Sequence, residues 1–61
     1  MKFKYTGEQT ANTRKYKVFA DEGETLTREA VAEATPIDIA PFGCRIEYCG
    51  SEMAVVVCYT D

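Results

Sequence analysis

Alternating apolar and polar side chains near both ends of the sequence place the first constraint on the fold. Near the start, "KFKYTGE" and "RKYKVFA" both alternate, and near the end "CRIEYC" and "MAVVVCYT" form a second pair of such segments. Alternation of this kind predicts half-buried strands, because successive side chains of a strand point to opposite faces. We predict strands at about residues 2–7, 14–20, 44–49 and 53–60.

The segment between the two strand pairs, "TLTREAVAEATP", predicts one helix at about residues 27–35. Thr27 is a suitable N-cap, because its hydroxyl can accept a hydrogen bond from an unpaired amide of the first turn. Pro36 disfavours helical geometry at the residue before it and therefore ends the helix early. The predicted fold class is a single small α+β domain, β-β-α-β-β, in which a short helix packs on one face of an antiparallel sheet.

The element order resembles that of the ubiquitin-like β-grasp fold, and the resemblance extends over nearly the whole chain. It implies a mixed sheet in place of a purely antiparallel one, and it implies no particular function. Conjugating members and sulfur carriers of that group end in Gly-Gly, whereas this sequence ends "VCYTD". We therefore do not predict a conjugation role.

Pairing of neighbouring strands predicts which side chains share a face. The first pair places Phe3, Tyr5, Tyr16 and Val18 on one face, and Lys2, Lys4, Lys15 and Lys17 on the other. For the last pair, Gly50 and Ser51 predict a type II′ turn, which needs positive φ at its first central residue. That register places on the helix-covered face Cys44, Ile46, Tyr48, Met53, Val55, Val57 and Tyr59, and leaves on the far face Arg45, Glu47, Cys49, Glu52, Ala54, Val56 and Cys58.

The three cysteines do not meet in this predicted register. Cys44 lies on the opposite face from Cys49 and Cys58, and the latter two are roughly 20 Å apart along the hairpin, far beyond the about 7 Å that a disulfide spans. A zinc site is not predicted either, because the spacing is C-x₄-C-x₈-C and the chain has no histidine. We expect reduced thiols that pack as small hydrophobic groups, as is typical of the cytoplasm.

The composition gives little support to catalysis. The chain has no histidine and one serine, Ser51, and its four glycines form no phosphate-binding loop. We predict no catalytic residue, no metal and no cofactor, and hence a non-enzymatic protein. No apolar run approaches the roughly 18 residues of a membrane span, and the first twenty residues do not have the pattern of a signal peptide, so a cytoplasmic location without membrane contact is expected.

The far sheet face of the predicted register is more apolar than a solvated face requires, and such surface tends to mark an interface. The alternative is that residues 36–42, "PIDIAPF", fold over it. We favour a protein-binding module with the contact residues Phe19, Arg45, Glu47, Ala54, Val56 and Cys58. A second, acidic surface is expected at Asp21, Glu22, Glu24, Glu29 and Glu33.

The charges are unevenly distributed along the chain, which suits docking to a partner of complementary charge. Residues 2–17 carry five cationic side chains and one acidic, whereas residues 18–61 carry two and nine. One alternative function is therefore nucleic-acid binding through Lys2, Lys4, Lys15 and Lys17. Another is a self-assembling subunit such as a homodimer, because so small a core gains from association.

In size and charge the chain also resembles the small acidic inhibitors of phages and other mobile elements, including anti-CRISPR proteins. This resemblance implies an inhibitor or regulator that occludes a partner by steric or electrostatic means. It rests on length and net charge, 61 residues and −3, and on no shared motif.

Overall fold

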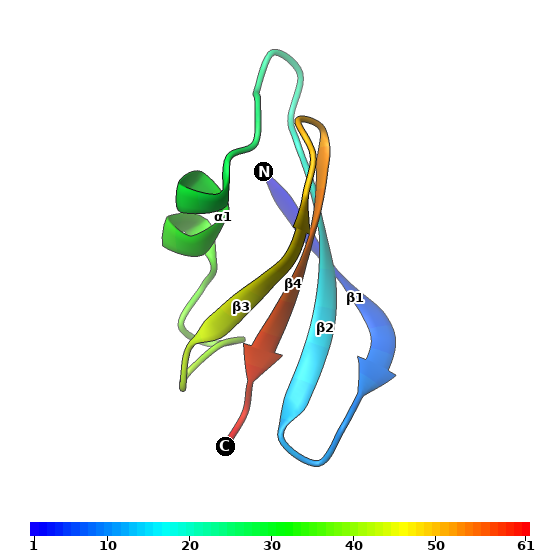
Figure 1. Ribbon diagram of the computed structural model, residues 1–61, viewed down its shortest axis with the longest axis vertical. Helices are drawn as coiled ribbons and strands as arrows, with labels where there is room; N and C mark the ends of the chain where they lie inside the picture. The colour runs from blue at the N-terminus through cyan, green and yellow to red at the C-terminus, as the bar shows by residue number, and fades with distance from the viewer.

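One four-stranded sheet, in the order β1-β2-β4-β3, forms the body of the computed structural model, which describes residues 1–61 (Figure 1). The elements are β1 (Lys2–Gln9), β2 (Thr13–Phe19), α1 (Arg28–Ala34), β3 (Cys44–Cys49) and β4 (Met53–Tyr59). The predicted α+β fold and the order β-β-α-β-β are confirmed.

All neighbouring strands of the sheet run antiparallel, and the last strand, β4, is inserted between β2 and β3. The mixed sheet that the β-grasp resemblance implies is therefore wrong. Each hairpin holds its two strands together locally, and the central β2–β4 pairing, from Thr13↔Tyr59 to Phe19↔Met53, joins the two hairpins.

Helix α1 begins after its N-cap, Thr27, and ends before its C-cap, Thr35. The Thr27 hydroxyl accepts a hydrogen bond from the Ala30 amide at 3.1 Å, as expected of an N-cap. At the other end the Thr35 backbone has left helical geometry, with ψ 116°, before Pro36. Val31 is the one buried residue of the helix. Burial of this side chain and the two capping interactions therefore stabilise this short element.

Removing the N-cap should destabilise the protein measurably. We expect Thr27→Ala to lower the free energy of unfolding by about 1 kcal/mol, because the Ala30 amide loses its partner. Urea denaturation followed by circular dichroism measures this. Thr27→Ser keeps the hydroxyl and should stay near wild type, and equal losses in both variants would contradict a capping role.

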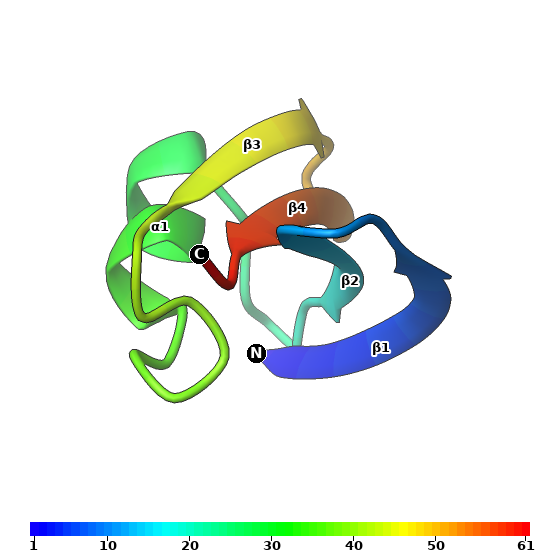
Figure 2. The ribbon, with the colours of Figure 1, turned by 90° about the horizontal axis from the view of Figure 1, so that it is seen from below.

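The core lies between one face of the sheet and a cover made of α1, the preceding loop and the connector to β3. Its buried residues are Val18, Leu26, Val31, Ala54, Val56 and Cys58. From the connector, Ile39 and Ala40 pack against this cluster. Figure 2 shows α1 and the connector on the same side of the sheet. The connector therefore packs on the face that carries Ala54, Val56 and Cys58, as the alternative to an interface there expected.

The predicted antiparallel pairing and the two faces of the first hairpin are correct: Phe3 pairs with Val18, Tyr5 with Tyr16 and Lys4 with Lys17. The predicted register of the second hairpin is wrong. The Gly50 amide donates to the Met53 carbonyl at 2.8 Å, so Ser51 and Glu52 form the turn. Gly50 does not have the positive φ of a type II′ turn.

A bulge between Ile46 and Tyr48 then shifts the register of the rest of β3 by one residue. As a result Ile46 pairs with Val56 and Cys44 with Cys58. Because a one-residue shift moves side chains to the other face, Cys44 and Ile46 share a face with Cys58 and Val56. Pairing of Ala54 with Val18 in β2 turns that face into the core, so Tyr48, opposite Val55, points away from it. The prediction that Cys44 and Cys58 lie on opposite faces is therefore wrong as well.

Candidate functional site

The sheet face opposite α1, which we call the outer face, is not covered by any other part of the chain. Cross-strand pairing aligns its side chains in rows, for example Lys4–Lys17–Val55–Tyr48 across the four strands. The outer face comprises Lys2, Lys4, Thr6, Glu8, Thr13, Lys15, Lys17, Phe19, Arg45, Glu47, Tyr48, Met53, Val55, Val57 and Tyr59.

Positive charge gathers on the outer face and negative charge elsewhere. Five of the seven cationic side chains of the chain lie there, namely Lys2, Lys4, Lys15, Lys17 and Arg45. Only Glu8 and Glu47, of ten acidic residues, reach this face. The outer face thus carries a formal charge of +3 (five minus two), whereas the whole chain carries −3.

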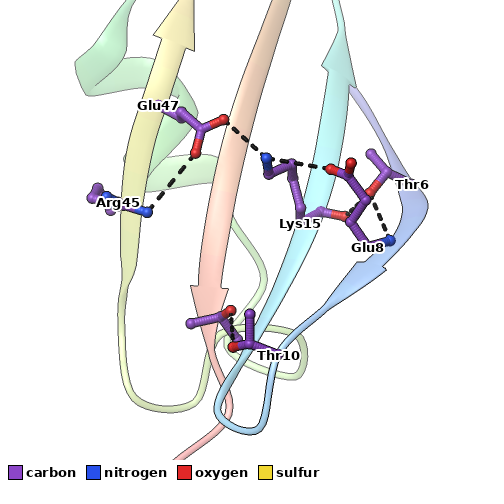
Figure 3. A network of polar contacts seen from close by, with 7 residues as sticks. Thr6, Glu8, Thr10, Lys15, Arg45 and Glu47 are labelled. Atoms are coloured by element: carbon purple, nitrogen blue, oxygen red, sulfur yellow. Dashed lines mark hydrogen bonds and ion pairs between the residues drawn. The ribbon is translucent and has the colours of Figure 1, made fainter.

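The two glutamates lie where the ladders of the edge strands are irregular, and both contact Lys15. The ladder between β1 and β2 is irregular between Tyr5 and Gln9, and that between β3 and β4 between Ile46 and Tyr48. Such irregularities bend a strand. Lys15 Nζ lies 3.3 Å from Glu8 Oε2 and 3.0 Å from Glu47 Oε1 (Figure 3).

This arrangement is a clamp across the sheet, because Glu8 comes from β1, Lys15 from β2 and Glu47 from β3. Hydrogen bonding to Glu47 first, and then to Glu8, raises the pKa of Lys15 above its ordinary value. A lysine that acts as a nucleophile or base needs a lowered pKa, so Lys15 has the opposite character. Glu47 also approaches Arg45, at 3.8 Å between Oε2 and Nη2.

The clamp separates two shallow hollows on the outer face. The larger, of about 470 Å³, lies toward the β1–β2 loop and is lined by Gly7, Glu8, Gln9, Thr10, Thr13, Lys15, Arg45, Glu47 and Val57. The other, of about 360 Å³, is lined by Thr6, Glu8, Lys15, Lys17, Glu47 and Val55. The valines of β4 form the apolar floor and charged side chains form the walls.

Exposed aromatic side chains stand among the cations at the other end of the face. Phe19 is 39% exposed and Tyr48 is 53% exposed. Phe19 pairs with Lys2 on one side and with Met53 on the other, and Tyr48 shares a row with Lys17. A further hollow of about 270 Å³ lies between Phe19 and the lysines Lys4 and Lys17.

Half of the predicted protein contacts lie on this surface and half do not. Phe19, Arg45 and Glu47 are on the outer face, as predicted. Ala54, Val56 and Cys58 are completely buried in the core, so they cannot form a contact surface in the folded chain. Pairing of β4 with β2, which places Ala54 opposite Val18 and Val56 opposite Tyr16, turns this face of β4 into the core and explains the error.

The four predicted nucleic-acid contacts do come together on the outer face. Lys2, Lys4 and Lys17 are exposed and make no ion pair, whereas Lys15 is held in the clamp. Sequence reasoning missed Glu8, Tyr48 and Val55 as members of this surface. One local signal was available: Gly7 has a φ of 88°, and a glycine inside a strand often marks a bulge.

The predicted acidic surface is divided between two places. Asp21 and Glu24, in the loop after β2, contact the Met1 amino group, with 3.0 Å from its nitrogen to Glu24 Oε1. Hydrogen bonding to this amino group lowers the pKa of Asp21. The exposed side chains of Glu22, Glu29 and Glu33 make no ion pair. Two of the three acidic residues of this loop thus hold the chain's first residue in place.

Two further findings complete the description. The one helix, of seven residues, is too short to cross a membrane. Comparison with protein-family models, curated proteins and solved structures finds no match for this chain.

Proposed function

We propose that this chain is a non-enzymatic binding module that docks a protein partner on its outer face. The observation that carries the proposal is the coincidence of two properties on one surface. The face is uncovered, and it concentrates five of the seven cations around an apolar strip formed by β4. The partner we infer is a protein surface rich in carboxylates.

The arrangement of the outer face supports a protein partner. Met53, Val55 and Tyr59 supply partly exposed apolar surface along the centre. Lysines on one flank and Arg45 with Glu47 on the other supply a charged margin. Protein interfaces have this anatomy, with an apolar centre and a polar rim. Complementary charge then steers the encounter and sets its orientation.

The polar groups within the face support binding over catalysis. The charge of Lys15 is balanced by two carboxylates that hold its pKa above the ordinary value. Thr6 donates to the Lys15 carbonyl at 2.9 Å and accepts from the Glu8 amide at 3.1 Å. These groups fix one another in place and so define the shape of the surface.

Reversing one free charge on the outer face tests the proposal. We expect Lys17→Glu to weaken capture of the partner at least tenfold, about 1.4 kcal/mol of binding free energy, because it opposes a partner's carboxylates. Arg14→Glu is the matched control: it changes net charge equally, in the same strand, and Arg14 is exposed with its Cα opposite Cys58 on the other face.

The measurement is capture from nuclease-treated host lysate by the three immobilised proteins, followed by coupling with a carbodiimide. This reagent joins a lysine amine to a carboxylate in direct contact. Support requires a protein that wild type and Arg14→Glu retain, that Lys17→Glu loses, and that is coupled to Lys4 or Lys17. Equal retention by all three proteins, or coupling only to this chain itself, contradicts the proposal.

A second candidate function, single-stranded nucleic-acid binding, is favoured by one specific observation. Phe19 and Tyr48 are exposed beside Lys2 and Lys17, and aromatic rings next to cations can stack on bases. Fluorescence anisotropy with a labelled oligothymidylate tests it. Binding that weakens steeply with salt and is reduced by both Lys17→Glu and Tyr48→Ala would favour this function over a protein partner.

A further inference from the structure

All three cysteines lie on the inner, helix-covered face of the sheet, and two of them are cross-strand partners. Cys44, in β3, pairs directly with Cys58, in β4. Cys49 pairs with Ala54 at the other end of the hairpin. All three are free thiols in this structure. Because opposed residues of neighbouring strands share a face, the side chains of Cys44 and Cys58 lie side by side.

The backbone at this pair already meets the requirements of a disulfide. The Tyr59 amide donates to the Gly43 carbonyl at 2.9 Å, which makes Gly43 and Tyr59 a hydrogen-bonded pair. The next pair along the ladder, Cys44 and Cys58, therefore occupies a non-hydrogen-bonded position. At such positions the Cα atoms are about 4.5 Å apart, within the about 4.4–6.8 Å found in disulfides.

The two thiols differ in exposure, which sets an order of reaction. Cys44 is partly exposed at the start of an edge strand, whereas Cys58 is completely buried in the centre of the sheet. Burial, and secondarily the proximity of Cys44, raises the pKa of the Cys58 thiol to about 11. An external reagent thus reaches Cys44 first, and Cys58 can react only with a partner delivered next to it.

From this geometry we infer that Cys44 and Cys58 form an oxidisable dithiol, which closes to an intrachain disulfide by exchange with a small-molecule disulfide such as oxidised glutathione. The inference goes beyond the proposed binding function and does not depend on it. It gives the chain a site of reversible covalent modification in its core.

The exchange proceeds in two balanced steps. The Cys44 thiolate attacks one sulfur of glutathione disulfide, the sulfur–sulfur bond of that reagent breaks, and one glutathione thiolate leaves. Cys58 then loses its proton and attacks Cys44 Sγ, the mixed disulfide breaks, and the second glutathione leaves. Two protein thiols are oxidised, one glutathione disulfide is reduced to two thiols, and the two protons end on those thiols.

Cys49 does not compete for either partner. It lies five positions from Cys44 along the same strand, about 17 Å away at 3.3 Å per residue. Its Sγ lies 3.6 Å from the Gly50 carbonyl, at the turn. The structure therefore specifies a single pairing out of three, and Cys49→Ser is a control that keeps the reactive pair intact.

The disulfide would fasten the edge strand β3 to β4. The strand β3 carries Arg45, Glu47 and Tyr48 on the outer face, so the bond also fixes one wall of the hollows there. A cross-link that restricts the unfolded chain raises stability. The oxidised protein should therefore unfold at a higher urea concentration than the reduced protein.

The test treats the folded, reduced protein with oxidised glutathione at mildly alkaline pH and measures intact mass, followed by peptide mapping. Wild type and Cys49→Ser should each become lighter by two hydrogen atoms at the pair, with one linked peptide containing residues 44 and 58. Cys58→Ala should stop at a glutathione adduct on Cys44. In Cys44→Ser, the buried Cys58 should remain a free thiol.

Three results would overturn the inference. One is a wild-type protein that accumulates the glutathione adduct on Cys44 without closing the intrachain bond. Another is a Cys44 that stays unmodified throughout while Cys49 reacts. The third is a linkage of residues 44 and 58 that forms only after denaturation. The wild-type mapping decides the question even if one of the cysteine variants fails to fold.

Discussion

Val56→Glu is expected to unfold the protein, whereas the same substitution at the adjacent residue, Val55→Glu, is expected to leave it folded. Val56 is completely buried between Ile46 and Tyr16 in the ladder. An unpaired carboxylate there costs several kcal/mol. A domain of 61 residues has a free energy of unfolding of roughly 3–9 kcal/mol, at about 0.05–0.15 kcal/mol per residue. The cost of this one substitution is therefore comparable to the whole free energy of unfolding.

Val55 is the matched control because it lies next in sequence on the outer face, where it pairs with Lys17. A glutamate there is partly solvated and faces a cation, so we expect a loss of no more than about 1 kcal/mol, the span of strand propensities. Circular dichroism and urea denaturation of both variants measure the difference. A folded Val56→Glu together with an unfolded Val55→Glu would show that β4 buries the opposite face, that of Val55 and Val57.

Leu26→Ala should produce the second largest loss of stability. Leu26 is 4% exposed and belongs to the core cluster beneath α1, and its amide donates to the Ser51 carbonyl at 2.8 Å. Truncating a buried leucine costs about 2–5 kcal/mol through lost burial and the cavity left behind. In so small a domain this is a large part of the total.

Ile37→Ala is the control for Leu26→Ala, since it removes nearly the same apolar volume from a side chain that is 76% exposed. We expect a change within about 0.5 kcal/mol, as for surface substitutions in general. The midpoint of urea denaturation, at constant slope, measures both effects. A loss at Ile37 as large as that at Leu26 would show that the connector contributes to the core more than its exposure indicates.

The outer face explains how a chain of net negative charge can present a cationic surface. Lys2, Lys4, Lys15 and Lys17 alternate in the first hairpin and so emerge on one side of the sheet. The carboxylates of Asp21, Glu22, Glu24, Glu29 and Glu33 lie in the loop after β2 and on α1. Net charge therefore says little about the partner of this protein, because each face has its own potential.

The local patterns were sufficient to predict the elements and the first hairpin. Alternation in β1 and β2 involves residues of very different polarity, Tyr16 and Val18 against Lys15 and Lys17. A one-residue shift in either strand would place its lysines on the buried face, so the alternation predicts which face is buried, and the structure has that face inside. Thr27 and Pro36 likewise delimit the helix by local backbone chemistry, and the structure follows them.

The second hairpin could not be predicted in the same way, because β4 reads "MAVVVCY" and is apolar on both faces. With no polar residue to mark the solvent side, a pattern of period two does not distinguish Val55 from Val56. The prediction then rested on the turn, which sets β3 against β4 but does not determine which face of β4 is buried.

Local sequence patterns are therefore sufficient to predict the strands, the helix with its caps, and the gathering of lysines on one side of the first hairpin. The orientation of β4 depends on contacts that form only in the folded chain. Pairing with β2 in the middle of the sheet places Ala54 beside Val18 and Val56 beside Tyr16, so the inner face of β2 selects the inner face of β4. These contacts join residues that are distant in sequence. The same is true of the pairing of Cys44 with Cys58 and of the ion pairs of Lys15 with Glu8 and Glu47.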